Sequence, residues 1–113
     1  MINLTLPYPP SANRYWRKTK TGRVYVSPEA ESYKNEVFFR TVKKRLHPFN
    51  GNVVLSMTFY RPQKSGDLSN RIKVLEDALQ GIAYNDDKQV VELHAYRNDD
   101  KHDPRVEVTI TEI

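Results

Sequence analysis

The sequence contains no cysteine, and this absence excludes disulfide bonds, thiolate metal sites and cysteine nucleophiles. Its three histidines, His47, His94 and His102, are scattered and lack the spacing of zinc ligands, so we expect them on the surface. No apolar run approaches the roughly 20 residues of a membrane span. The N-terminus also lacks the charged-then-apolar pattern of a signal peptide. These absences predict a soluble, cytoplasmic protein without membrane attachment, and the length of 113 residues predicts a single domain over 1–113.

Charge is distributed unevenly between the two halves of the chain. Residues 1–50 contain ten Lys or Arg against three Glu, whereas residues 51–113 contain eight against eleven Asp or Glu. A basic half suits the phosphate backbone of nucleic acid, and an acidic half suits a metal ion. This combination favours a nuclease over a protein that only coats DNA. Many globular domains are as asymmetric by chance, so the motifs must decide.

The periodicity of apolar residues predicts an α+β domain, a mixed but mostly antiparallel sheet packed with two helices. A first helix is predicted to begin at Ser27-Pro28-Glu29 and to run to about Leu46, with Phe38 on the same side as Tyr33 and Val37, and with cations in its last turn. A second helix is predicted from Asn70 to Ile82, with one apolar face and an opposite face that carries Asn70, Lys73 and Asp77. Strands are predicted over 1–6, 24–26, 52–60, 89–96 and 105–113.

Acidic residues flank the second predicted helix. Asp67 precedes it, and Asp86 and Asp87 follow it. Mg²⁺ takes oxygen ligands, usually one or two carboxylates plus substrate phosphates, and it assists phosphodiester hydrolysis. A helix of this length spans roughly 20 Å, so the two ends form one site only if the fold brings them together. Taken alone, Asp67 could be a helix cap and Asp86-Asp87 an ordinary turn; Ser69 is itself a good N-cap, which leaves Asp67 for another role.

A basic segment occupies residues 14–23, with five Lys or Arg, no acid and two aromatic residues. Aromatic side chains in a cationic loop can stack on the exposed bases of a nucleic acid. The alternatives are a solvated loop, or a role of Tyr15 or Trp16 as an anchor in a dimer interface or in the core. The predicted DNA contacts are Asn13, Arg14, Tyr15, Trp16, Arg17, Lys18, Lys20 and Arg23.

Four motifs, in order and at compatible spacing, resemble the RusA family of phage-derived resolvases of four-way (Holliday) DNA junctions. They are Pro9-Pro10-Ser11-x-Asn13-Arg14-Tyr15, Asp67-Leu68-x-Asn70-x-x-Lys73, Asp77-Ala78-Leu79 and Asp86-Asp87-x-Gln89-Val90-Val91. Any one of them is a weak signal, whereas the ordered set is specific and covers nearly the whole chain. The resemblance implies an α+β fold, a homodimer, and Mg²⁺-dependent cleavage of two opposed strands by paired active sites.

The resemblance also implies roles for single residues. It places metal-binding carboxylates at Asp67 and Asp87, with Asp86 adjacent, and a required lysine at Lys73. It also implies an aspartate where this chain has Ser69. Serine brings no negative charge, so metal affinity should fall unless another acid, such as Asp86 or Asp77, takes over.

We therefore interpret the chain as a homodimeric endonuclease that uses Mg²⁺, with Mn²⁺ as a possible substitute, to resolve four-way junctions. Asp67, Asp86, Asp87 and Lys73 would be catalytic, the three aspartates would hold the metal, and Asn70 would orient the site and contact DNA. The Lys73 ammonium would stabilise phosphate charge, and Asp77 would pair with Lys73 or support the site from outside. The alternatives are a junction-binding protein weakened at Ser69, and a structural or regulatory dimer that binds no metal and contacts protein or RNA.

Overall fold

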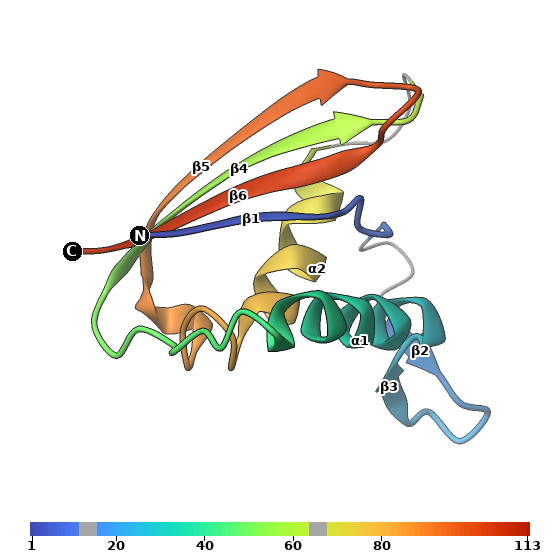
Figure 1. The fold of residues 1–113 in the computed structure, drawn as a ribbon. Coiled ribbons are helices and arrows are strands. Elements are labelled where there is room, and N and C mark those ends of the chain that lie inside the picture. Colours follow the sequence, from blue (N-terminus) through green and yellow to red (C-terminus); the bar gives the residue numbers. More distant parts are fainter. Residues whose placement is uncertain (12–15, 64–67) are drawn as a thin grey trace.

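A four-stranded sheet in the order β1-β6-β4-β5 forms one layer of the molecule (Figure 1). The computed structural model describes residues 1–11, 16–63 and 68–113. The strands are β1 (Ile2–Pro7), β4 (Val53–Arg61), β5 (Val90–Asp99) and β6 (Arg105–Glu112). β6 pairs antiparallel with both β1 and β4, whereas β5 pairs parallel with β4. The predicted α+β class with a mixed, mostly antiparallel sheet is confirmed.

Two helices, α1 (Pro28–Val42) and α2 (Ser69–Leu79), cover one face of this sheet (Figure 1). Alternate residues of β4 form the centre of the core: Val53, Leu55, Met57 and Phe59 are fully buried, as the alternation predicts. The residues between them are partly exposed on the open face, as is typical of an antiparallel sheet covered on one side. No helix in the described ranges is long and apolar enough to cross a membrane.

The start of α1 follows the prediction and its end does not. The Ser27 hydroxyl accepts a hydrogen bond from the Ala30 amide at 3.2 Å, and Pro28 is the first helical residue. The helix ends at Val42 instead of Leu46, and Arg45 adopts a left-handed conformation with φ 50°. Before Arg45 the chain tightens into i→i+3 hydrogen bonds, from the Lys44 amide to the Thr41 oxygen and from the Arg45 amide to the Val42 oxygen, which end the α-helical pattern. The cations at 43–45 therefore follow the helix instead of forming its last turn.

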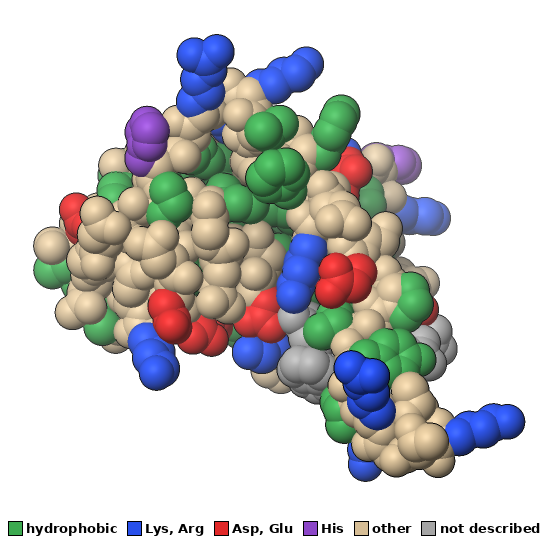
Figure 2. Space-filling view, turned by 90° about the horizontal axis from the view of Figure 1, so that it is seen from below, with side chains coloured by type: hydrophobic (Ala, Val, Ile, Leu, Met, Phe, Trp, Pro, Cys, Tyr) green, Lys and Arg blue, Asp and Glu red, His purple; other side chains and the backbone are tan. Residues whose placement is uncertain are grey.

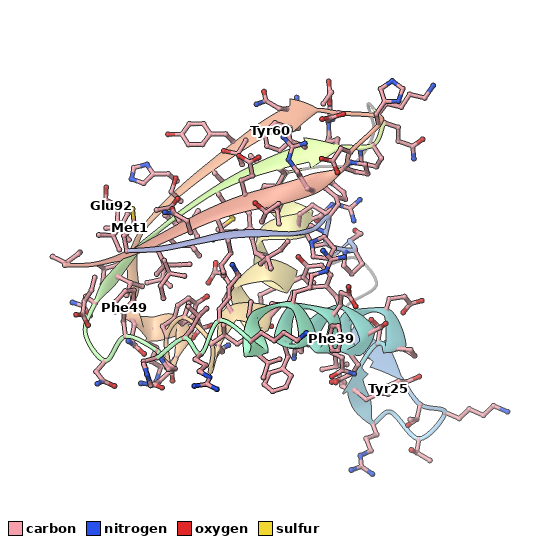
Figure 3. All side chains as sticks on the ribbon, viewed as in Figure 1. Met1, Tyr25, Phe39, Phe49, Tyr60 and Glu92 are labelled. Atoms are coloured by element: carbon pink, nitrogen blue, oxygen red, sulfur yellow. The ribbon has the colours of Figure 1, made fainter. Side chains whose placement is uncertain are left out.

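The buried side of α1 is narrower than predicted. Ala30, Tyr33, Val37 and Thr41 are buried, at the spacing of one helical face. Phe38 lies about 100° away from Val37 around the axis and is 60% exposed, which corrects its predicted position. Figure 3 shows the neighbouring Phe39 pointing from α1 away from the sheet.

The boundaries of α2 also differ from the prediction. The helix begins at Ser69 and ends at Leu79, and its N-cap is Leu68, which makes no capping hydrogen bond with its side chain. The prediction of Ser69 as N-cap is therefore wrong, because Leu68 already has helical torsion angles of −58° and −47°. The apolar face buries Leu75, Ala78 and Leu79 as predicted, and also Val74.

The segment between α2 and β5 is attached to the rest of the fold by two polar side chains. The hydroxyl of the buried Tyr84 donates to the backbone oxygen of Glu76 at 2.8 Å. The side-chain nitrogen Nε2 of Gln89 donates to the backbone oxygens of Phe49 at 2.7 Å and of Gly51 at 2.8 Å. These bonds fasten the short 3₁₀ helix η2 (Asp87–Gln89), which the sequence did not predict, between α2 and the loop before β4.

A second, two-stranded sheet lies apart from the first. β2 (Trp16–Lys18) pairs antiparallel with β3 (Val24–Val26), and this hairpin extends beyond α1 (Figure 1). Its turn is closed by the Thr19 amide, which donates to the Arg23 backbone oxygen at 2.8 Å, and by Gly22 at φ +86°. The prediction located β3 and missed β2.

We predict that Tyr84→Phe lowers the free energy of unfolding by about 1 kcal/mol, because it leaves a partly buried carbonyl of α2 without its donor. Urea unfolding of both proteins measures this difference. Tyr25→Phe is the matched control, since Tyr25 is exposed on the hairpin, and we expect a change within about 0.5 kcal/mol there. Equal stabilities of the two variants would contradict the role of the Tyr84 hydroxyl.

Candidate active site

Lys73 is at the centre of the charged face of α2. Its ammonium lies 3.1 Å from a carboxylate oxygen of Asp77, four residues later, in the predicted i, i+4 pair. This hydrogen bond is the main reason that the pKa of Lys73 is raised above its ordinary value. The Lys73 side chain is half exposed, whereas that of Asp77 is mostly covered. The Lys73 ammonium is therefore accessible from solvent while it is paired with the mostly covered carboxylate of Asp77.

The charge of Asp87 acts on this part of α2 although Asp87 belongs to a different element. It is the first residue of η2 and is partly buried. Its negative charge helps to raise the pKa of Lys73 on α2. Burial is the main reason that the pKa of Tyr84 is raised, and the charge of Asp87 adds to that effect. The fold therefore brings two predicted site residues, Lys73 and Asp87, within electrostatic range of each other.

Asp86 has a structural task in the same segment. Its side chain accepts a hydrogen bond from the Lys88 amide at 2.9 Å, and the Gln89 side chain accepts one from the Asp86 amide, which completes a capping box for η2. The bond from the Lys88 amide, and next a hydrogen bond with Asp87, hold the pKa of Asp86 below its usual range. Asp86 thereby fixes the orientation of the turn that carries Asp87.

Part of the predicted site lies outside the described residues. This is the case for Asp67 and, in the basic segment, for Asn13, Arg14 and Tyr15; the side chains of Trp16 and Arg17 are also outside the description. Within the described part of the chain, no three Asp, Glu, His or Cys side chains are grouped closely enough to hold a metal ion. The predicted meeting of Asp67 with Asp87 therefore stays a prediction.

Glu76 is a charged neighbour of the site that the motifs did not identify. It is partly buried in α2, and this burial raises the pKa of its carboxyl, to which the charge of Asp87 adds. The lysine three residues earlier, Lys73, opposes this effect. The available sequence signal was its position three residues after Lys73, on the polar side of the helix.

Arg71 links the start of α2 to the N-terminal segment and was also missed. Its guanidinium donates to the backbone oxygen of Pro9 at 3.0 Å and lies 5.1 Å from the centroid of the Tyr8 ring. Asn70, its neighbour, is partly buried in the same first turn. Arg71 thereby positions the chain that leads into the basic segment next to the helix that carries Lys73.

The basic segment forms the hairpin described above. Lys18, Lys20 and Arg23 are exposed on it. Figure 2 shows Lys and Arg side chains around this protruding part of the molecule. Residues 14–23 contain no Asp or Glu, so the exposed cations give the hairpin a positively charged surface.

Comparison with known proteins agrees with the motifs. The family model described as endodeoxyribonuclease RusA matches residues 7–111. The crossover junction endodeoxyribonuclease RusA of Escherichia coli strain K12 is 34% identical over 115 residues, which cover 98% of this chain and 94% of that protein. The proteins of that name from Shigella sonnei strain Ss046 and from Enterobacteria phage 82 are each 33% identical over the same shares of the two chains.

The match extends over almost the whole chain and includes both the basic hairpin and the segment from α2 to η2. The family predicted from the four motifs is confirmed. Its members are named endodeoxyribonucleases, which are enzymes that cleave DNA. The chain belongs to the RusA endodeoxyribonuclease family.

Proposed function

We propose that this protein is a metal-dependent endonuclease that resolves four-way DNA junctions as a homodimer. The observation that carries the proposal is the position of Asp87, which the capped η2 helix holds within electrostatic range of Lys73 on α2. In such an arrangement the carboxylate can bind a divalent cation and the lysine can stabilise the charge of a phosphate. Family membership supplies the substrate class, since the relatives are named crossover junction endodeoxyribonucleases.

Asp67 and Asp87 are the proposed ligands of a divalent cation, with Asp86 assisting. The donor set fits Mg²⁺ or Mn²⁺, because carboxylates are hard oxygen ligands and the sequence contains no thiolate to favour a softer metal. When bound, the ion would activate water and neutralise charge that develops on the scissile phosphate. Ser69 offers a hydroxyl in place of the aspartate that the family resemblance implies.

The remaining roles belong to the cations of the chain. Lys73 would turn its half-exposed ammonium towards the phosphate, since its contact with Asp77 is a helix-surface pair worth only a few tenths of a kcal/mol. Lys18, Lys20 and Arg23 on the hairpin would hold the backbone of a junction arm, together with Asn13, Arg14 and Arg17. Tyr15 and Trp16 would stack on bases exposed at the branch point, and Asn70 would orient the strand.

A homodimer suits this substrate, because a four-way junction presents two equivalent scissile phosphates related by a two-fold axis. The fold leaves a surface for self-association at the edge strand β5. Among its side chains Val91, Leu93 and Tyr96 are exposed by 54%, 38% and 56%. Exposed apolar residues on a long edge strand are a feature that soluble proteins usually cover.

Two alternatives from the sequence analysis are tested against this proposal. One is junction binding without cleavage, since Ser69 removes an expected negative charge. The other is a structural or regulatory dimer that contacts protein or RNA through the hairpin. Salt-sensitive preference for branched over linear DNA would exclude the second, and cleavage would exclude both.

We predict that the protein cleaves a synthetic four-way junction when Mg²⁺ or Mn²⁺ is present and not when EDTA is. Asp87→Asn should reduce the cleavage rate at least about a hundredfold, because it removes a proposed ligand while retaining shape. Junction binding in EDTA, measured by gel shift, should be unchanged. Asp103→Asn is the control, since Asp103 is an exposed acid in the loop between β5 and β6. Full cleavage by Asp87→Asn would remove Asp87 from the mechanism.

We predict that junction affinity falls steeply with salt, with a log–log slope near −0.9 for each phosphate neutralised. Replacing Lys20 and Arg23 by Gln should make that slope shallower by about two. The matched control replaces Lys43 and Lys44, which are exposed just after α1. Identical slopes for both double variants would show that the hairpin does not hold the DNA.

We predict a mass in sedimentation experiments of twice the chain mass of 13.2 kDa. Tyr96→Lys, which inserts a charge on the exposed edge strand, should shift the protein towards monomer. The monomer should release singly nicked junctions instead of paired nicks. A dimer that is insensitive to Tyr96→Lys would place the interface elsewhere.

A further inference from the structure

Glu76 and Ser69 lie on the same face of α2. They are seven residues apart, which is close to two full turns, or about 10 Å along the axis. Side chains of an α-helix generally lean towards its N-terminus, so position 76 suits a carboxylate that is directed back over the turn that contains Lys73. This is the direction of the end of the helix where Ser69 stands in place of the aspartate that the family resemblance implies.

The surroundings of Glu76 place it next to the other proposed site residues. Its carboxyl is partly buried and within electrostatic range of Asp87 in η2 and of Lys73 in α2. The hydroxyl of Tyr84 holds the backbone oxygen of Glu76 at 2.8 Å, which fixes this turn of the helix relative to the segment that leads to Asp87. The charges of two carboxylates on separate elements, Glu76 in α2 and Asp87 in η2, thus act on each other.

The other acids of this region are already engaged. Asp77 accepts hydrogen bonds from Lys73 at 3.1 Å and from Gln80 at 3.3 Å. Asp86 caps η2 through the Lys88 amide. Among the hydrogen bonds of residues 1–11, 16–63 and 68–113, none ends on the carboxylate of Glu76. Of the acids near Asp87, Glu76 is therefore the one whose oxygens are least committed to holding the fold.

We propose that Glu76 supplies the carboxylate that Ser69 lacks, as a ligand of the divalent cation together with Asp87. The proposal rests on the function proposed above and specifies its metal site. It explains how a chain without an acid at position 69 keeps the negative charge of the site, because the acid is moved along one face of the same helix. It also changes the expectation for Asp77 and Asp86, which serve Lys73 and η2 instead of the metal.

The test is Mn²⁺ binding in the absence of DNA, measured from the electron paramagnetic resonance signal of the free ion. Glu76→Gln should weaken binding at least about tenfold, which is the lower end of the loss expected when a group that supports a metal site is removed. Glu36→Gln is the matched control, because Glu36 is an exposed helical glutamate paired with Arg40 at 2.8 Å. Its Mn²⁺ affinity should equal that of the unmodified protein.

A second pair of variants separates ligation from a structural role. Ser69→Asp should restore Mn²⁺ affinity in the Glu76→Gln background. It places a carboxylate at position 69, where the family resemblance implies one, on the same face of α2 as position 76. A glutamate that only balances Lys73 would not be replaced in this way. Failure of Ser69→Asp to restore binding would overturn the proposed compensation. Glu76→Ala, with the strongest helix former at this position, repeats the test if the glutamine variant does not fold.

The Asp87→Asn variant separates this inference from the function on which it rests. If Asp87→Asn weakens Mn²⁺ binding and Glu76→Gln does not, Glu76 is not a ligand and the metal site remains. If the unmodified protein binds no Mn²⁺, and Asp87→Asn therefore changes nothing, the metal-dependent function itself is wrong. Loss of binding in both variants, with restoration by Ser69→Asp, supports the assignment.

Discussion

The parallel pairing of β4 with β5 is the constraint on which the arrangement of the charged residues depends. Parallel neighbours cannot be joined by a tight turn, so the chain must return across the face of the sheet, and α2 makes this return. One side of α2 is buried in the common core next to α1, which leaves Lys73, Glu76 and Asp77 on its other side. The proposed chemistry is located on a connection that the sheet topology requires.

The end of this connection is held more firmly than its sequence suggests. Gln89 makes hydrogen bonds with both ends of its side-chain amide, to Phe49 and Gly51 on one side and to Asn85 and Asp86 on the other. A polar side chain satisfied at every position rigidifies its surroundings. Asp87 therefore lies in a rigid turn. A rigid turn would keep a proposed metal ligand in position before the metal binds.

How much could be predicted from the sequence follows from the range of each interaction. The β4 alternation, the start of α1 at Ser27 and the apolar stripe of α2 are local patterns, and the structure has all three. The end of α1 and the cap of α2 depend on the backbone torsion angles of Arg45 and Leu68. Neither arginine nor leucine is a residue type that strongly indicates such a position. The electrostatic effect of Asp87 on Lys73 and the hydrogen bond from Arg71 to Pro9 join residues far apart in sequence, so no local periodicity could predict them. A role of Glu76 was not predicted, because the motif that begins at Asp77 does not include it.

The hairpin and the helix differ in stability in a way that suits their proposed roles. A two-stranded hairpin alone is marginally stable in water, and β2–β3 lies outside the four-stranded sheet (Figure 1). Its cations can therefore adjust to the varied geometry of a branched DNA at little cost to the core. The chain before the hairpin is attached to α2 by the hydrogen bond from the Arg71 guanidinium to the backbone oxygen of Pro9. The proposed DNA-binding surface and the proposed cleavage site are thus separate parts of the chain, and the bond from Arg71 to Pro9 attaches the segment before the hairpin to the first turn of α2.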